Sequence, residues 1–329
     1  MSPDELAPAG GPPLSDLALG PDADLNEPLE PQLGRSGDMA PATAKRRRRE
    51  WVQLLADALH YRRTQIGLVL FLFIVVIAAF GPLFAPHSPY AFVTTPYAHP
   101  SARAVLGGDV IGRDVLSRVL YGGRSVLILA FLATALGMAM GVSLGLAAGY
   151  ARAAVDDAIM RLLDVLLAFP QIVFVLLLVS VLGPRLWLIV LTVGLSHAPR
   201  IARVTRGATL EVKERDFVKA AESLGVSRVK IAFTEILPNI TSPLLVEFGL
   251  RLTYSIGLIA ALSFMGFGMQ PPACDWGLMI NENRIGILVQ PYSIFVPVAL
   301  IAILTIGVNL ATDGLSHAMI GLERDTGAA

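Results

Sequence analysis

The chain has 329 residues, of which 54% are hydrophobic and only 16% are charged, and its 26 basic and 26 acidic residues give no formal net charge. In soluble domains about a quarter of the residues are charged, so this composition favours a membrane protein. The single cysteine, Cys274, excludes an internal disulfide and a metal cluster built on cysteines.

The first 65 residues differ from the rest of the chain. Residues 1–44 are rich in Pro, Gly, Ala and acidic residues and contain no aromatic residue. They predict a disordered acidic tail, and they lack the pattern of a signal peptide. The run "KRRRRE" opens a basic juxtamembrane segment over 45–65. A basic run of this kind can bind nucleic acid, but the apolar span that follows favours contact with anionic lipid.

Apolar segments long enough to cross a bilayer predict an all-α membrane protein with six transmembrane helices. The predicted spans are 66–86, 124–150, 158–182, 186–206, 243–268 and 292–314. A loop over 87–123 separates the first span from a core over 124–314. Lys and Arg gather before the first span and between the fourth and fifth spans. The positive-inside rule then predicts cytoplasmic termini, an extracytoplasmic 87–123 loop and a cytoplasmic C-terminal segment over 315–329.

The loop before the second span carries charges of alternating sign, at Asp109, Arg113, Asp114 and Arg118. A solvated outer loop is the simplest interpretation. The alternative is that Arg113 and Asp114 contact a partner permease or a docked binding protein.

The second span carries a glycine at every fourth position, Gly137, Gly141, Gly145 and Gly149. This spacing places small residues along one helix face, where a neighbouring helix can approach closely. We interpret the row as a packing face.

A charged segment over 207–240 interrupts the apolar spans, and its centre is "FVKAAESLGVSRVKIAFTEILPN" (217–239). Read as a helix, 214–224 places Phe217, Ala220, Ala221 and Leu224 on one face. Gly225 stands where a helix end favours positive φ, and Ser227 is a plausible N-cap for a second helix. The stripe of that second helix is Val226, Val229, Phe233 and Ile236.

This pattern predicts two short amphipathic helices hinged at a glycine, which we call the elbow. One interpretation is a lever that meets another protein. The other is a helix pair lying on lipid headgroups.

Two pairs of opposite charges fall within spans. Arg161 and Asp164 are three residues apart, and Glu247 and Arg251 are four apart, so each pair can form an ion pair on one helix face. The alternative interpretation is that Glu247 or Arg251 faces a translocation pathway or a partner permease. In "QPPACDWG", after the fifth span, Trp276 fits an interfacial aromatic anchor, and the loop as a whole fits a cap on the outer mouth.

The sequence lacks the glycine-rich phosphate loop of a nucleotide-binding protein, and its five histidines have no metal-ligand spacing. It therefore predicts a chain that is not an enzyme, with no catalytic residue, metal or bound cofactor of its own and no affinity for nucleic acid.

The elbow resembles the cytoplasmic loop of ATP-binding-cassette (ABC) importer permeases, because "KAAESLG" is followed after nine residues by "EILP". The resemblance implies a coupling helix that docks on an ATPase subunit. The matching positions are Ala220, Ala221, Gly225, Leu237 and Pro238, with Ser227 between the two blocks. Two residues depart from the family pattern: Lys219 stands in place of an acidic residue and Glu235 in place of an apolar one.

Further blocks resemble the C-type permeases of dipeptide and oligopeptide importers, and together they cover about residues 66–320. They are "LGGDVIGRDVLSRVLYGGRSVL", "LLDVLLAFP", "ALSFMGFGMQPPACDWGLMI" and "NLATDGLSHAM". The resemblance implies a type I ABC importer permease in the bacterial inner membrane. The implied partners are a second homologous permease, two ATPase subunits that use ATP and Mg²⁺, an extracytoplasmic solute-binding protein and membrane lipid.

The function expected from this resemblance is half of a translocation pathway for di- or oligopeptides. The same blocks fit permeases for nickel chelates, glutathione or other small solutes. A standalone secondary transporter or a membrane scaffold is the alternative from a different class.

Overall fold

The computed structural model describes residues 59–327, with side chains through residue 318, so the predicted acidic tail lies outside the described residues. The described residues form helices and loops, without a β-strand. The long helices are α2 (Arg62–Phe80), α3 (Val115–Tyr150), α4 (Ala153–Leu167), α5 (Gln171–Leu182), α6 (Leu186–Lys213), α10 (Thr241–Phe264) and α12 (Tyr292–Gly327). Shorter helices are α7 (Asp216–Ser223), α8 (Arg228–Ile231), α9 (Leu237–Asn239) and α11 (Trp276–Asn283).

Four helical segments are long and apolar enough to cross a membrane: Arg62–Leu83, Val115–Tyr150, Thr241–Phe264 and Tyr292–Ala318. The pair α4 and α5 adds a fifth if it counts as one broken span. These helices confirm the prediction of an all-α membrane protein. The count of six spans stays a prediction, because α6 carries arginines from its middle onward and is not among the apolar helices.

The predicted third span over 158–182 is not one straight helix. It consists of α4 and α5, which are bent by 79° relative to each other. Pro170 is the N-cap of α5, and Phe169 precedes it. A proline cannot continue the hydrogen-bond ladder of a helix and disfavours helical geometry in the residue before it, so the chain turns here.

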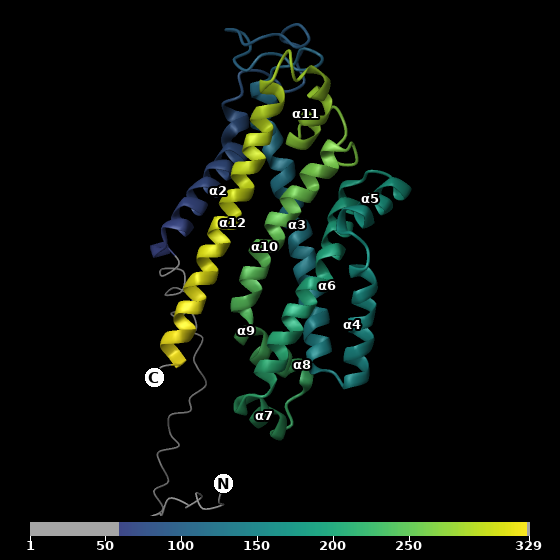
Figure 1. The fold of residues 1–329 in the computed structure, drawn as a ribbon, viewed down its shortest axis with the longest axis vertical. Helices are drawn as coiled ribbons and strands as arrows, with labels where there is room; N and C mark the ends of the chain where they lie inside the picture. Colours follow the sequence, from purple (N-terminus) through teal and green to yellow (C-terminus); the bar gives the residue numbers. More distant parts are fainter. Residues whose placement is uncertain (1–58, 328–329) are drawn as a thin grey trace, which may run out of the picture. The chain divides into compact units, whose positions relative to one another are not determined.

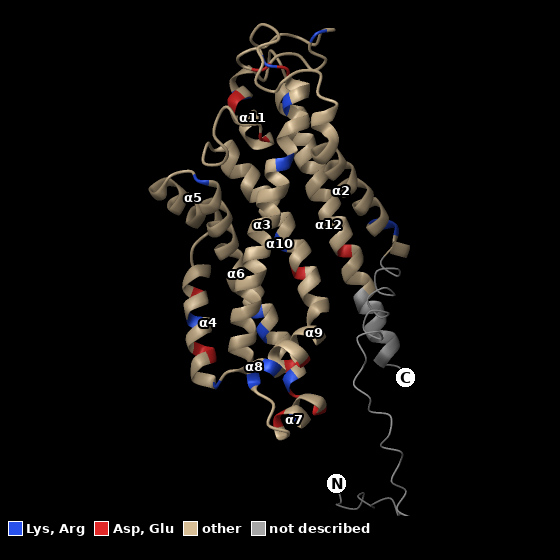
Figure 2. Cartoon of the chain, turned by 180° about the vertical axis from the view of Figure 1, so that it is seen from behind, with Lys and Arg blue, Asp and Glu red and all other residues tan. Residues whose placement is uncertain are grey.

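The elbow and the helix α11 lie at opposite ends of the helices (Figure 1). Lys, Arg, Asp and Glu gather around α4, α7 and α8 at the elbow end, whereas the helices between the two ends show few charged residues (Figure 2). The main hydrophobic core lies among α2, α3, α5, α6, α10, α11 and α12. A smaller core supports the elbow.

The glycine row of α3 packs against α6, as its spacing predicts. A Cβ atom added to Gly141 would lie 2.5 Å from Cβ of Ile201, and one added to Gly145 would lie 2.5 Å from Cβ of Thr205. Gly137 and Gly149 likewise face His197 and Thr209 of α6. The two backbones therefore approach closely enough that any larger side chain in the row would force them apart.

Gly141→Val is expected to destabilise the chain by about 2 kcal/mol or more, because an overpacked site between two helices costs about 1–3 kcal/mol. Thermal unfolding of the purified chain in detergent measures the effect. Gly207→Ala on α6 is the matched control, since the space around a Cβ atom at Gly207 is open. Equal melting temperatures for Gly141→Val and the native chain would contradict the packing assignment.

Candidate functional site

The elbow has the hinge that the sequence predicts. α7 ends in a pair of backbone hydrogen bonds, from Val226 N–H to Ala221 O at 3.1 Å and from Gly225 N–H to Glu222 O at 3.0 Å. Gly225 adopts a φ of +74°. This is the Schellman arrangement that satisfies the last carbonyls of a helix, and it requires a residue that tolerates the left-handed conformation.

The second limb of the elbow starts after Ser227 and continues through α8, a π-helical turn over Ala232–Ile236, and α9. Ser227 occupies the predicted N-cap position in an extended conformation, but its side chain makes no capping hydrogen bond. Its backbone carbonyl instead accepts a hydrogen bond from Ile231 N–H at 3.0 Å. Leu237 and Pro238 are half-buried where this limb leads into α10.

Val218, Ile231 and Ile236 hold the elbow to the rest of the chain. All three are fully buried, and they pack with residues at the ends of α3, α6 and α10. The hydroxyl of Tyr150, at the end of α3, donates a hydrogen bond to Glu222 of α7. Lys213 Nζ lies 5.3 Å from the centre of the Tyr150 ring, within the range of a cation–π contact. The elbow is thus fixed to the ends of three long helices.

The predicted stripes are divided between this core and the surface. Ile236 belongs to the core and Val226 packs against it, whereas the other large apolar side chains are exposed. Leu224 is 83% exposed, Val229 is 70% exposed and Phe233 is 58% exposed. Ala220 and Gly225 are also exposed, and Ala221 is half-buried. The elbow therefore presents large apolar side chains and small residues to its surroundings, which is the pattern of a surface that another protein or a membrane covers.

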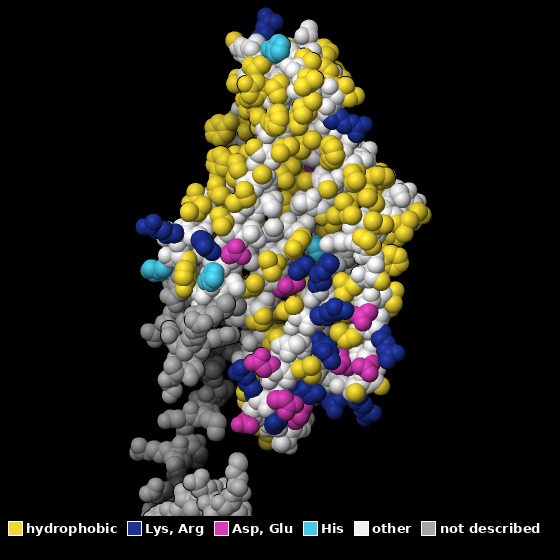
Figure 3. All heavy atoms as spheres, in the orientation of Figure 1, with side chains coloured by type: hydrophobic (Ala, Val, Ile, Leu, Met, Phe, Trp, Pro, Cys, Tyr) yellow, Lys and Arg dark blue, Asp and Glu magenta, His cyan; other side chains and the backbone are white. Residues whose placement is uncertain are grey.

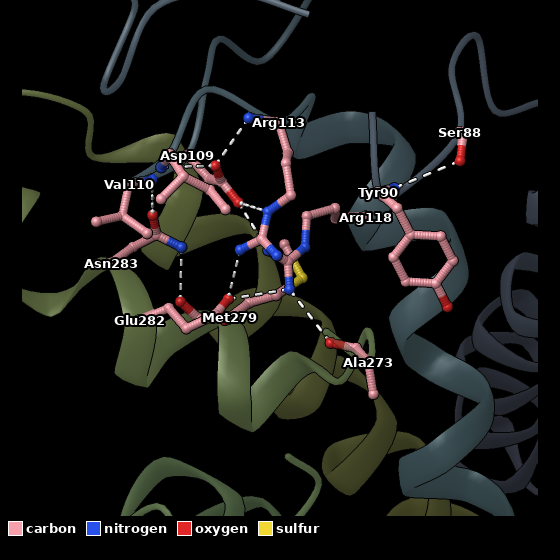
Figure 4. Close-up of polar contacts among 11 residues, drawn as sticks. Ser88, Tyr90, Asp109, Val110, Arg113, Arg118, Ala273, Met279, Glu282 and Asn283 are labelled. Atoms are coloured by element: carbon pink, nitrogen blue, oxygen red, sulfur yellow. Dashed lines mark hydrogen bonds and ion pairs between the residues drawn. The ribbon is translucent and has the colours of Figure 1, made fainter. Parts of the chain in front are cut away.

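The opposite end of the molecule holds a buried ion cluster of Asp109, Arg113, Arg118 and Glu282 (Figure 4). Asp109 Oδ2 lies 2.6 Å from Arg113 Nε and 2.7 Å from Arg118 Nη1. Glu282 Oε2 lies 3.0 Å from Arg113 Nη2 and 2.9 Å from Arg118 Nη2. The two carboxylates thus share two guanidinium groups.

The expectation of a solvated outer loop is wrong for this cluster. Asp109 and Arg118 are fully buried, and Arg113 is nearly so. Burial raises the pKa of Asp109 and of Glu282, while the positive charge of Arg118 acts in the opposite direction on both. The cluster joins the loop before α3 to α11. Arg113 and Glu282 are far apart in the sequence, so local sequence patterns could not predict their contact.

Asp114 begins α3 and has no exposed surface. Its Oδ2 accepts hydrogen bonds from Ser117 N–H at 3.0 Å and from Ser117 Oγ at 2.6 Å. Asp114 is therefore a helix cap.

Trp276 is not an interfacial anchor. Its side chain is fully buried, and its indole N–H donates to the carbonyl of Val119 at 2.9 Å. Gly122 and Gly123 make room for the ring, because Cβ atoms there would lie 2.9 Å and 2.7 Å from it. The sequence shows a tryptophan near the end of a span, but only the packing of α11 on α3 reveals that it faces inward.

The structure contains one of the two ion pairs that the sequence predicts within the spans. Glu247 and Arg251 form the predicted ion pair, with Glu247 Oε1 2.7 Å from Arg251 Nε, and both side chains are largely buried. The predicted pair of Arg161 and Asp164 is wrong, because Asp164 pairs with Arg203 of α6. α4 and α6 run side by side, which brings a partner from another helix to Asp164.

The helical fold and the apolar spans define a membrane protein whose elbow is exposed at one end of its helices. Residues 141–320 match the family described as binding-protein-dependent transport system inner membrane component. Residues 62–102 match the N-terminal transmembrane domain of oligopeptide transport permease C. The chain belongs to the binding-protein-dependent transport family and is an inner-membrane permease of an ABC importer.

Sequence comparison with curated proteins also finds permeases. The glutathione transport system permease protein GsiD of Escherichia coli O6:K15:H31 is 36% identical over 264 residues, which cover 79% of this chain and 87% of the relative. The protein of the same name from Shigella boydii serotype 4 has the same identity and coverage. Among solved structures, an inward-facing form of the MetNI methionine ABC transporter aligns with a TM-score of 0.49 and 18% identity, over 61% of this chain and 95% of that chain.

Proposed function

We propose that this permease forms half of a translocation pathway for short peptides and couples to ATPase subunits through its elbow. The observation that carries the coupling assignment is the row of Leu224, Val229 and Phe233, which are exposed around the left-handed Gly225. Exposed apolar side chains of this size on a charged segment favour a protein partner over water.

Transport by this family depends on a binding protein, as the description of the family states. The proposed complex contains this chain, a second homologous permease, two ATPase subunits that bind ATP and Mg²⁺, and an extracytoplasmic solute-binding protein. ATP hydrolysis belongs to the ATPase subunits in this proposal.

The elbow suits the transmission of a rigid-body motion. Its inner side is packed on the ends of α3, α6 and α10 through Val218, Ile231 and Ile236. A push on the exposed side therefore reaches three long helices together. Alternating access follows when paired permeases rock between two arrangements as the ATPase subunits close.

Short peptides are the proposed cargo, because the segment 62–102 matches a domain of an oligopeptide permease. Glutathione is the second candidate, since the curated relatives are named as glutathione permeases. Both are small solutes that carry peptide bonds and free carboxylates.

Reconstitution of the complex in liposomes with its binding protein tests the proposal. ATP-dependent uptake of radiolabelled trialanine or of labelled glutathione is expected, and their ratio identifies the preferred cargo. Gentle extraction from the native membrane should recover the second permease and the ATPase subunits with this chain. Repeated recovery of this chain alone, with solute uptake that does not need ATP, would favour a standalone transporter.

A further inference from the structure

Two arginines lie on helices that pack against each other; Arg251 is largely buried and Arg200 is exposed. Arg251 stands near the middle of α10, which is a candidate membrane span, and Arg200 stands near the middle of α6. A charged side chain at the centre of a bilayer costs about 2.5–3.5 kcal/mol on insertion scales. Such a residue is tolerated when it faces protein or water, and it often marks the route of a polar solute.

The helices that carry the two arginines touch about one turn away from each of them. His197 Nε2 of α6 and Ser255 Oγ of α10 lie 3.0 Å apart, so the two helices meet at this level. Arg200 follows His197 by about one helical turn, and Arg251 precedes Ser255 by about one turn. Both arginines are close enough to His197 to act on its ring electrostatically.

The two arginines differ in their partners. Arg251 is paired with Glu247, but Arg200 meets the amide oxygen of Gln171 at 3.4 Å and forms no ion pair with a carboxylate of residues 59–318. The next two arginines of α6 each have a carboxylate partner on α4, Asp164 for Arg203 and Asp156 for Arg206. Of these three arginines of α6, Arg200 is thus the one without a carboxylate partner among the described residues.

The surroundings of this charge are open and polar. Arg200 is exposed, and Ser196 and Gln171 beside it are half-buried and joined by a hydrogen bond of 2.8 Å. Tyr254, whose ring centre lies 5.2 Å from Arg251, is also exposed. Lys and Arg side chains, interspersed with Asp and Glu, extend over one face from the middle of the molecule to its lower end (Figure 3).

We propose that Arg200, assisted by Gln171 and Arg251, forms an anion-binding station of the translocation pathway that takes a carboxylate of the solute. A guanidinium group binds a carboxylate through two parallel hydrogen bonds, and its affinity rises where water is partly excluded. Glu247 limits the positive charge, so that the solute can leave again. This inference rests on the proposed importer function for the pathway, but its local electrostatics can be measured independently.

The test measures the electrostatic potential beside the two arginines with a single cysteine. Tyr254→Cys in a Cys274→Ser background places one thiol next to Arg251, in the assembled complex. Two methanethiosulfonate reagents, one bearing a sulfonate and one a trimethylammonium group, then label this thiol, and their rates are divided by those for a free thiol. We expect the sulfonate to react faster, and we expect Arg200→Gln to lower the ratio of the two rates by about tenfold.

Two further variants show whether the effect belongs to Arg200. Arg200→Lys keeps the charge and should keep most of the ratio. Arg185→Gln removes an exposed arginine from the start of the same helix and should change the ratio less than twofold. A ratio near one in the parent protein, the absence of labelling by either reagent, or equal effects of Arg185→Gln and Arg200→Gln would each overturn the proposal.

Transport separates this inference from the proposed function. ATP-dependent uptake of a peptide with a free carboxylate should fall about tenfold in Arg200→Gln and remain in Arg185→Gln. Normal uptake in Arg200→Gln would overturn the station. A complex that lacks ATP-dependent uptake without any substitution would count against the importer function, while the labelling ratio would still report on the anion site.

Discussion

Leu224→Glu is expected to abolish solute import by the assembled complex while the chain itself stays folded. Leu224 is 83% exposed, so folding gains little from its side chain. A carboxylate placed in an apolar contact must lose its hydration when the partner docks. Loss of a central contact residue costs about 2 kcal/mol or more, which weakens engagement by about 30-fold.

Uptake and ATP hydrolysis should be measured together on the same liposomes. Leu224→Met keeps an apolar side chain of similar size and is expected to import normally, which makes it the matched control. Phe233→Glu, on the second limb, should reproduce the defect. Normal import by both glutamate variants would remove the elbow from the coupling pathway, whereas a chain that fails to reach the membrane would show a role in folding instead.

Arg118→Met is expected to be the most destabilising single change at the opposite end. Its guanidinium group is fully buried and is shared by Asp109 and Glu282. Without it, two carboxylates stay buried with Arg113 as their remaining partner in the cluster. Breaking a buried ion pair by removing one partner costs about 3–5 kcal/mol, which is a large part of the stability of a typical domain.

Thermal unfolding in detergent measures this loss, and a double variant isolates its cause. Arg118→Met combined with Glu282→Gln removes one charge of each sign, so it should be more stable than Arg118→Met alone. A smaller loss in the double variant would show that the uncompensated carboxylate is responsible. A melting temperature for Arg118→Met within two degrees of the native chain would mean that water reaches the cluster, against its burial in the structure.

Local sequence was enough to predict the hinge and the packing face. Gly225 is identified by the positive φ that the end of α7 requires, and this requirement depends on a few adjacent residues only. The four-residue spacing of Gly137 to Gly149 predicts a close helix contact, because a helix repeats about every 3.6 residues. The apolar lengths of the spans likewise follow from the thickness of a bilayer.

The sequence of the elbow did not show which of its faces is buried and which is exposed. Of the predicted stripes, Phe217, Leu224, Val229 and Phe233 are exposed and Ile236 is buried. The structure also buries Val218 and Ile231, which the stripes do not contain. Periodicity identifies which residues share a helix face, but it does not tell which apolar face meets the chain's own core and which is left for a partner.

Composition, span length and cap chemistry act over short stretches, and they were sufficient to predict an all-α membrane protein with a glycine-hinged elbow between apolar helices. The burial of Asp109, Arg113 and Arg118 beside Glu282, the contact of Trp276 with α3 and the pairing of Asp164 with Arg203 became visible in the folded chain alone. Each of these contacts joins residues far apart in the chain, and burial depends on which distant segments cover a side chain.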